Sequence, residues 1–219
     1  MSELRKTFDA SLKTLKEDLL LMFEAVNDSY KKMFNALKTM DKSLANEIIE
    51  EDKKINAMEN AINQAVYLVI LKQCPVAKDL RFMLSAVKIA NDLERIADYA
   101  TNGAMYILKT FNVESAYNEE ILKYKKELLH MLDLVKDSYQ DNNISKAFEV
   151  SERDTIIDSL YQNQLDEFVN VAKSMTDTKA EEASRALLII KQLERAGDHI
   201  TNIAEQIVYL HGGKILDLN

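Results

Sequence analysis

The sequence predicts an all-α protein built from two tandem three-helix bundles. Two observations lead to this fold class. First, the 219 residues include four glycines, one proline and no tryptophan, so the chain has few residues that break helices or form tight turns. Second, residues 93–104 and 193–204 share seven of twelve amino acids, which indicates an internal duplication. The expected domains are residues 1–111 and 112–219.

The first half is predicted to contain three long helices, at residues 3–38, 42–73 and 76–110. Asp41, in the turn after the first helix, is the expected N-cap of the second. The Cys74-Pro75 step should end that helix, because the residue before a proline disfavours the helical conformation. Residues 111–115 are the expected hinge between the two halves.

The second half repeats this plan, with helices predicted at residues 116–140, 144–174 and 178–212. Asp141-Asn142-Asn143 is the expected turn, with caps, before the middle helix. Thr178 and Glu181 have the spacing of a capping box and should open the last helix, which should end near Gly212-Gly213. Helices of about thirty residues are rods on the order of 50 Å long, and three such amphipathic rods bury their apolar stripes by packing side by side.

Composition and charge exclude several classes of protein. A net charge of −8 argues against nucleic-acid binding, which needs a basic surface. A single cysteine allows no internal disulfide and suits a reducing compartment. The N-terminal residues lack the apolar core of a signal peptide, and the longest apolar runs are too short to span a bilayer. We therefore expect a cytoplasmic protein without membrane insertion.

The duplicated segment places carboxylates beside the apolar seam of the last helix in each half. In the second half Glu194, Asp198 and Glu205 form a stripe about 110° around the helix from that seam. In the first half Glu94 and Asp98 occupy the same positions. A seam of alanines and glycine would let a neighbouring helix approach closely, so these carboxylates belong at the rim of each bundle.

The preceding helix of each half carries a matching polar pair at spacing i, i+4. The first half has Asp52 and Asn56, and the second half has Asp154 and Asp158. Like charges at this spacing repel by a few tenths of a kcal/mol, and acidic groups converging from two helices repel more. A cation bound among these oxygens would offset the repulsion between the carboxylates, and oxygen-rich sites suit Mg²⁺, Ca²⁺, Mn²⁺ or iron. No set of cysteines and histidines indicates a structural zinc site.

Two alternatives remain open from the residues alone. In one, Arg95, Arg153, Arg195 and nearby lysines neutralise the carboxylates, and the protein is a helical adaptor that holds no metal. In the other, the protein is a metal-storage or di-metal redox bundle. The Glu-x-x-His pairs of such bundles are missing, because Ala97 and Gly197 stand where the histidines would be. Nor does the sequence contain a Gly-rich phosphate loop or a nucleophile constellation, so we do not expect an enzyme.

At these residues the chain resembles the PhoU family, which regulates phosphate transport. In the first half the resemblance lies in the segment from Gln73 to Arg81 and in Asp92-Leu93-Glu94-Arg95-Ile96-Ala97-Asp98. In the second half it lies in the segment from Leu193 to Glu205 and in Gly212-Gly213. It spans nearly the whole chain. It implies two three-helix bundles, each with a Glu/Asp-x-x-x-Asp metal motif.

The resemblance also implies a cytoplasmic, usually dimeric regulator of high-affinity phosphate uptake. Such a protein represses the phosphate-starvation response when phosphate is plentiful, through contacts with the ATPase subunit of a phosphate ABC transporter and with a membrane sensor histidine kinase. The implied cofactor is a divalent or trivalent metal ion: iron, manganese, magnesium or zinc. Carried onto this sequence, the metal ligands are Asp52, Glu94, Asp98, Asp154, Asp158, Glu194 and Asp198.

Asn56 departs from the family pattern, which usually has a second aspartate there. The first site should therefore bind a cation more weakly than the second, or hold fewer ions. Asn102, Asn202, Glu205 and His199 are weaker candidates for ligands or for their supporting shell. A histidine in the position of His199 is more often an ordinary hydrogen-bonded surface residue than a metal ligand. Asp79 and Arg81 are interpreted as structural, since an acid in the first turn suits the helix dipole.

Overall fold

The computed structural model describes residues 3–73, 75, 77–110, 116–172, 174–213 and 216–218. Every regular element in these ranges is a helix. The helices are α1 (Glu3–Thr39), α2 (Lys42–Gln73), α3 (Ala77–Lys109), α4 (Ala116–Leu122), α5 (Lys125–Asp141), α6 (Ile144–Ala172) and α7 (Asp177–Gly212). None of the helices described combines the length and the apolar composition needed to cross a bilayer.

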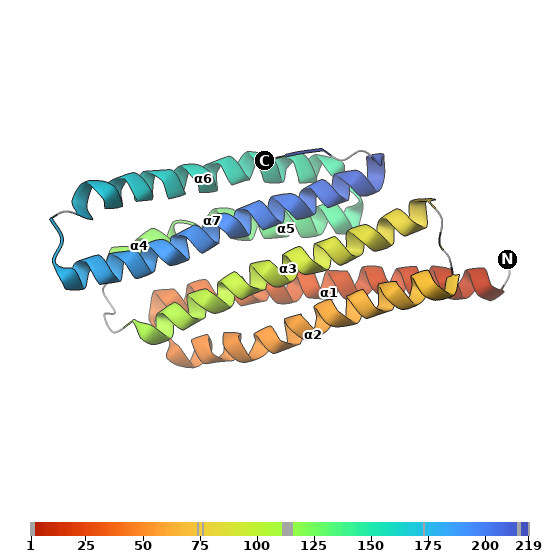
Figure 1. The fold of residues 1–219 in the computed structure, drawn as a ribbon, viewed down its shortest axis with the longest axis horizontal. Coiled ribbons are helices and arrows are strands. Elements are labelled where there is room, and N and C mark those ends of the chain that lie inside the picture. The colour runs from red at the N-terminus through yellow and green to blue at the C-terminus, as the bar shows by residue number, and fades with distance from the viewer. Residues whose placement is uncertain are drawn as a thin grey trace.

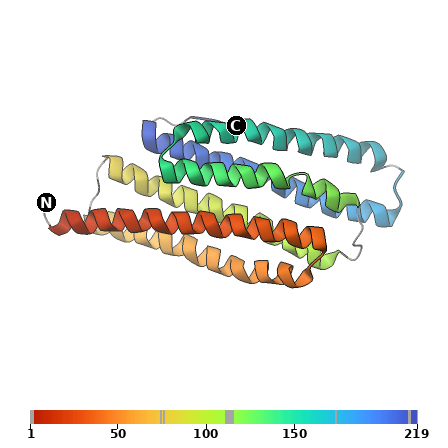
Figure 2. The same cartoon turned by 180° about the vertical axis from the view of Figure 1, so that it is seen from behind.

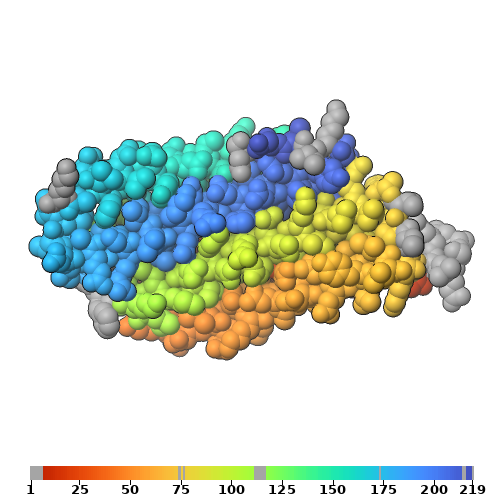
Figure 3. Space-filling model, in the orientation of Figure 1, coloured from red at the N-terminus to blue at the C-terminus, as the bar shows by residue number. Residues whose placement is uncertain are grey.

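The helices form two three-helix bundles that lie side by side. α1, α2 and α3 pack on one another, as do α5, α6 and α7 (Figure 1). The bundles meet mainly along α3 and α7, which cross one face of the molecule together (Figure 3). On the opposite face α1 packs against α5 (Figure 2). α2 and α6 therefore form the two outer edges, and the predicted fold class is confirmed.

The apolar seams predicted from the sequence form the bundle interiors. Leu93 and Ala97 of α3 are fully buried, as are Leu193 of α7 and the glycine at 197. Complete burial of a large aliphatic side chain stabilises the folded state by about 1.5–3 kcal/mol relative to exposure. Because the polar positions lie beside these seams, the packing of α2 on α3 and of α6 on α7 brings the acidic side chains of neighbouring helices together.

The helix predicted over 116–140 is wrong as a single rod, because it is broken into α4 and α5. At the break, Lys123 N–H and Tyr124 N–H bond to carbonyls three residues back, those of Glu120 and Ile121, both at 3.3 Å. The Tyr124 side chain is fully buried, and its hydroxyl donates to Gln164 Oε1 of α6 at 2.8 Å. The break between α4 and α5 thus coincides with a contact between helices and not with a glycine or proline.

Two predicted turns are confirmed and one predicted cap is wrong. Asp41 Oδ1 accepts hydrogen bonds from the Ser43 and Leu44 N–H groups at 2.9 and 3.0 Å, as an N-cap does. Asn142 ends α5 in the left-handed conformation, with φ of 54°. The last helix, however, begins at Asp177 after Thr176. Thr178 therefore lies inside its first turn and does not open a capping box.

Some sequence predictions fall outside the described residues. These are the features at Cys74 and Val76 and the hinge at 111–115 with the domain boundary between 111 and 112. The helix predicted to run to 174 ends earlier, because α6 stops at Ala172 and Ser174 lies in a turn. α2 ends at Gln73 and α3 begins at Ala77, which agrees with a helix ending just before Pro75.

Candidate metal centre

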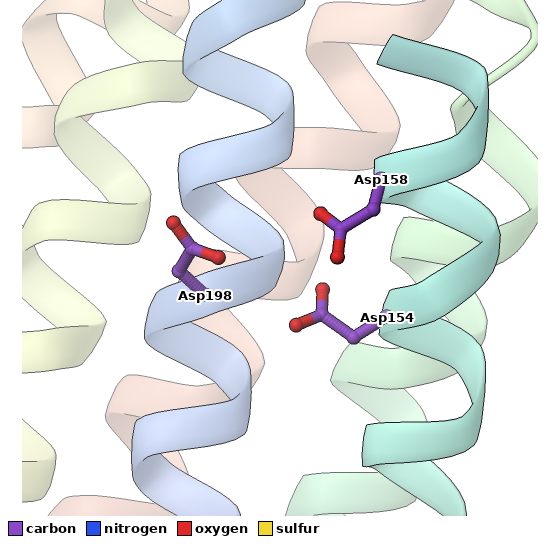
Figure 4. Close-up of side chains that lie close together, drawn as sticks. All are labelled: Asp154, Asp158 and Asp198. Atoms are coloured by element: carbon purple, nitrogen blue, oxygen red, sulfur yellow. The ribbon is translucent and has the colours of Figure 1, made fainter. Parts of the chain in front are cut away.

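Three aspartates of the second half converge between α6 and α7. Asp154 and Asp158 lie one turn apart on α6, and Asp198 faces them from α7 (Figure 4). One carboxylate oxygen from each residue lies within 4.8 Å of the others. Sequence spacing alone predicted this convergence. The i, i+4 pair lies on the side of one helix that packs toward the next helix, where the rim carboxylate lies.

Gly197 and Thr201 of α7 shape the space around Asp154. A Cβ on Gly197 would collide with Asp154 Oδ1, so only a residue without a side chain lets this carboxylate lie against α7. Thr201 Oγ1 donates to Asp154 Oδ2 at 3.0 Å. The other oxygen, Oδ1, is buried and has no hydrogen-bond partner among the described residues. A buried carboxylate oxygen left unpaired is costly, and a cation among these aspartates would satisfy it, so the residues present fit a metal ion.

The electrostatics of this cluster favour a cation for a second reason. Burial, with the nearby charges of Asp158 and Asp198, raises the pKa of Asp154 from 3.8 to about 7, although the Thr201 hydrogen bond opposes the rise. Burial and Asp198 likewise raise the pKa of Asp158. In the described part of the chain, no lysine, arginine or histidine nitrogen lies within 4.0 Å of these three carboxylates. Among the described residues, the negative charge of the cluster therefore has no direct ion-pair partner.

Glu194, the fourth predicted ligand of this half, lies beside the cluster but already has a partner. Its Oε1 is 2.6 Å from Lys191 Nζ, and this ammonium also lies 4.6 Å from the centre of the Tyr161 ring. Glu194 Oε2 is buried without a hydrogen bond in the described structure. One of its oxygens is thus engaged by Lys191 and the other is left for a ligand.

The first half repeats the threonine contact, but it offers fewer carboxylate oxygens to a metal ion. Thr101 Oγ1 donates to Asp52 Oδ1 at 3.1 Å, as Thr201 does to Asp154. Asn56 Nδ2 donates to Asp52 Oδ2 at 3.3 Å, while Asn56 Oδ1 is buried without a described partner. Asn56 therefore donates a hydrogen bond to its neighbour Asp52, adds no negative charge and still offers one amide oxygen to the site.

Arg95 covers the other two predicted ligands of the first half. Its guanidinium lies 3.3 Å from Asp98 Oδ2 and 3.6 Å from Glu94 Oε2. Burial is the main cause that raises the pKa of both carboxyls, while Arg95 lowers them. Neutralisation by arginine, the alternative drawn from the sequence, is therefore present in the first half.

The corresponding cations of the second half lie elsewhere. Arg195 packs its guanidinium 5.7 Å from the centre of the Tyr99 ring. Arg153 lies 3.5 and 3.6 Å from Glu127 and Glu149, which are not predicted ligands. The two halves thus differ: the first carries an arginine over its acids, and the second leaves three aspartates facing one another.

Two of the weaker candidates, Glu205 and His199, have hydrogen-bond partners outside this cluster. Glu205 Oε1 accepts a hydrogen bond from the Leu218 N–H at 2.8 Å and so holds the C-terminal segment. His199 Nδ1 donates to Asp92 Oδ1 of α3 at 2.8 Å. Asn102 and Asn202 are half-buried, one turn beyond Asp98 and Asp198.

Thr101 and Thr201 were missed as site residues by the reasoning from sequence. Both are buried, and each orients an aspartate of the preceding helix. The signal was present, because this threonine is one of the identical positions of the duplicated segment.

Comparison with known proteins gives the site its context. The model of one protein family, described as the PhoU domain, matches residues 19–107 and again residues 121–207. A relative from Clostridium acetobutylicum, named a phosphate-specific transport system accessory protein PhoU homolog, is 35% identical over 218 residues, covering 98% of this chain and 99% of that protein. A relative of the same name from Streptococcus pneumoniae is 32% identical, covering 99% and 100%.

Two solved structures have the same fold. A crystal structure described as the phosphate transport system regulatory protein PhoU from Streptococcus pneumoniae matches with a TM-score of 0.87 at 30% identity, covering 96% of this chain and 99% of that one. The crystal structure of PhoU from Pseudomonas aeruginosa matches with a TM-score of 0.87 at 29% identity, covering 94% and 100%.

Proposed function

The chain belongs to the PhoU family, and from this premise we propose that it is an accessory regulator of phosphate transport. One observation carries the proposal: the similarity extends over nearly the full length of relatives named as phosphate-specific transport accessory proteins. Both halves of the chain contribute to the match.

In its finer form, the proposal is a cytoplasmic, non-enzymatic, homodimeric protein that represses the phosphate-starvation response when phosphate is plentiful. It would act by contact with the ATPase subunit of a phosphate ABC transporter and with a sensor histidine kinase. The long helical faces of the two bundles suit such contacts, because they offer extended surfaces that do not depend on an active-site pocket.

The acidic clusters would hold metal ions as part of this regulator. In the second half, Asp154, Asp158 and Asp198 would provide the ligands, with Glu194 as a further donor. Thr201 fixes the orientation of Asp154, and Gly197 leaves the room in which its free oxygen lies. A bound cation would supply positive charge that offsets the repulsion between α6 and α7. In the first half, Asp52, Asn56, Glu94 and Asp98 would form the lesser site.

A second candidate is the adaptor that holds no metal. The contacts of Arg95 with Glu94 and Asp98 favour it, because an arginine already neutralises these acids. Elemental analysis of protein purified without chelator separates the two candidates. The metal-binding regulator should contain iron, manganese, magnesium or zinc and should show a higher melting temperature when that ion is added. Absence of both effects would leave the adaptor.

Regulation itself is tested in the host cell. Disruption of the gene should switch on starvation-induced phosphatase activity in phosphate-rich medium, and the intact gene supplied in trans should restore repression. A triple variant with Asp154, Asp158 and Asp198 changed to Asn reports whether the cluster matters for repression. Unchanged repression after gene disruption would rule out the regulatory role, whatever the metal content.

A further inference from the structure

A second group of polar side chains lies at the end of the molecule where α3 begins and α7 ends. It surrounds a pocket of about 310 Å³ to which Lys16 of α1, Lys78 of α3, Tyr139 of α5 and His211 of α7 contribute. His211 is thirteen residues beyond Asp198 on α7, a separation of about 20 Å along a helix. The pocket is therefore distinct from the acidic clusters.

Two of the pocket's cations have unused hydrogen-bonding capacity. Lys16 Nζ donates to the Gln140 carbonyl at 3.2 Å, which uses one of its three N–H groups. Lys78 is exposed in the first turn of α3, where the helix dipole adds to its positive charge. In the described ranges, no carboxylate oxygen lies within 4.0 Å of either ammonium. In a chain of net charge −8, two lysines on one pocket that form no ion pair with a described carboxylate favour an anionic ligand.

Tyr139 lines the pocket, and Lys16 Nζ lies 5.8 Å from the centre of its ring. Its side chain is 3% exposed, yet its hydroxyl has no hydrogen-bond partner in the part of the chain that is described. An unsatisfied buried hydroxyl costs about 1–3 kcal/mol, and such groups call for an explanation. Capping of the α5 C-terminus by Lys16 explains one contact of that lysine but accounts for neither Lys78 nor the Tyr139 hydroxyl. A ligand in this pocket that accepts hydrogen bonds accounts for both lysines, and the buried Tyr139 hydroxyl would reach it only after a shift of the pocket wall.

The rest of the pocket wall is apolar. Phe82 of α3 and Ile207 and Leu210 of α7 line it. Small-molecule sites of a few hundred Å³ typically combine such walls with a few convergent polar groups. We propose that this pocket binds a small organic anion, with its phosphate or carboxylate group held by Lys16 and Lys78 and its apolar or aromatic body packed on Phe82 and Leu210.

Calorimetric titration of the full chain, freed of metal with a chelator, tests the proposal with phenyl phosphate as probe. Removal of metal keeps the test independent of the acidic clusters and of the proposed regulation. Phenyl phosphate should bind, and Lys78→Met should weaken binding by about tenfold or more, as expected for the loss of a charge-assisted contact. Lys16→Met should do the same. Lys88→Met, an exposed lysine on the same helix as Lys78, is the matched control and should change nothing.

Tyr139→Phe separates a binding role from a structural one. If the hydroxyl serves the ligand, this variant weakens binding while the melting temperature stays the same or rises, because an unsatisfied group has been removed. Benzoate in place of phenyl phosphate shows whether a carboxylate also serves. No binding at millimolar phenyl phosphate, equal losses in Lys78→Met and Lys88→Met, or inorganic phosphate binding as tightly as phenyl phosphate would each overturn the proposal. Because Lys78 is exposed, its variant should fold even if that of Lys16 does not.

Discussion

Gly197 is the residue at which helix packing and the candidate metal centre meet. Alanine normally stabilises a helix by about 1 kcal/mol relative to glycine. Here its Cβ would collide with Asp154 Oδ1, so the carboxylate would have to turn out of the cluster. Gly197→Ala should therefore lower the melting temperature of the metal-free protein or, if Asp154 moves, abolish metal binding at the second site. Thermal unfolding and metal titration measure the two effects.

Gly212 is the matched control on the same helix. A Cβ built there meets no atom of another described segment within 4 Å, so Gly212→Ala should leave metal binding unchanged and should not lower stability. If the two variants behaved alike, steric contact with Asp154 would not be the reason for glycine at 197.

Asp154 should give the metal-free protein an unusual pH dependence. Its pKa rises from 3.8 to about 7 in the folded chain, chiefly because it is buried. The folded state then holds this proton more tightly than the unfolded state, so the free energy of unfolding falls as the pH rises from about 4 to 7. A tenfold difference in proton affinity corresponds to about 1.4 kcal/mol. Urea unfolding at pH 5 and pH 8 should show the lower stability at pH 8.

Asp154→Asn removes the titrating group and should flatten this pH profile. Asp166→Asn, an exposed aspartate on the same helix, should keep the slope. Metal competes with the proton for the carboxylate, so added metal should restore stability at pH 8 more than at pH 5. A stability that is higher at pH 8 in the metal-free wild type would contradict the assignment.

The sequence predicted the acidic residues of the site because helical spacing places i and i+4 on one face. It could not predict which cation each acid meets. Arg95 and Arg195 occupy equivalent positions of the duplicated segment, yet one pairs with Glu94 and Asp98 and the other packs on Tyr99. A long side chain can contact several residues of other helices, and which of them lie within reach depends on how the bundles pack.

At the scale of helices, the start of α2 depends on one side chain. Asp41 Oδ1 accepts from two backbone N–H groups, whereas Thr176, at the start of α7, makes no side-chain cap hydrogen bond. Asp41→Ala should therefore cost about 1 kcal/mol of stability, and Thr176→Ala should cost much less. Urea unfolding of both variants checks the contrast, and equal losses would contradict it.

Helix lengths were predictable where breakers or caps mark the ends, as at Asp41 and Asn142. The break between α4 and α5 was not, because no glycine or proline marks it. Tyr124 is buried there against α6, and such an interhelical contact overrides local helix propensity. At the start of α7 a signal was present but misleading. The capping-box pattern of Thr178 and Glu181 occurs inside the helix and does not mark its first residue.

At the scale of the whole molecule, the two copies of the duplicated segment lie against each other. Tyr99 and His199 follow Asp98 and Asp198 in the two copies, and their rings lie 5.8 Å apart across the α3–α7 contact. His199 also donates to Asp92 of α3. The two candidate sites are thus joined by residues next to their ligands, although those residues differ between the copies. Duplication of the sequence therefore does not imply equal sites.

This asymmetry leads to a prediction that treats the two halves as variants of each other. Asn56 and Asp158 are equivalent positions, and carboxylate ligands bind hard cations more tightly as their number of charges rises. Wild-type protein should show one tighter and one weaker binding phase in a metal titration. Asn56→Asp should strengthen the weaker phase, on the order of tenfold, and Asp158→Asn should weaken the tighter phase similarly. The exchange of both residues together should invert the order of the halves. Arg95 limits the gain in metal affinity from Asn56→Asp, since its guanidinium already pairs with Glu94 and Asp98.

Arg95→Gln tests whether this arginine, and not the missing carboxylate, makes the first site weaker. If Arg95→Gln alone strengthened the first site and Asn56→Asp had no effect, the arginine would be the cause of the difference in affinity between the two sites.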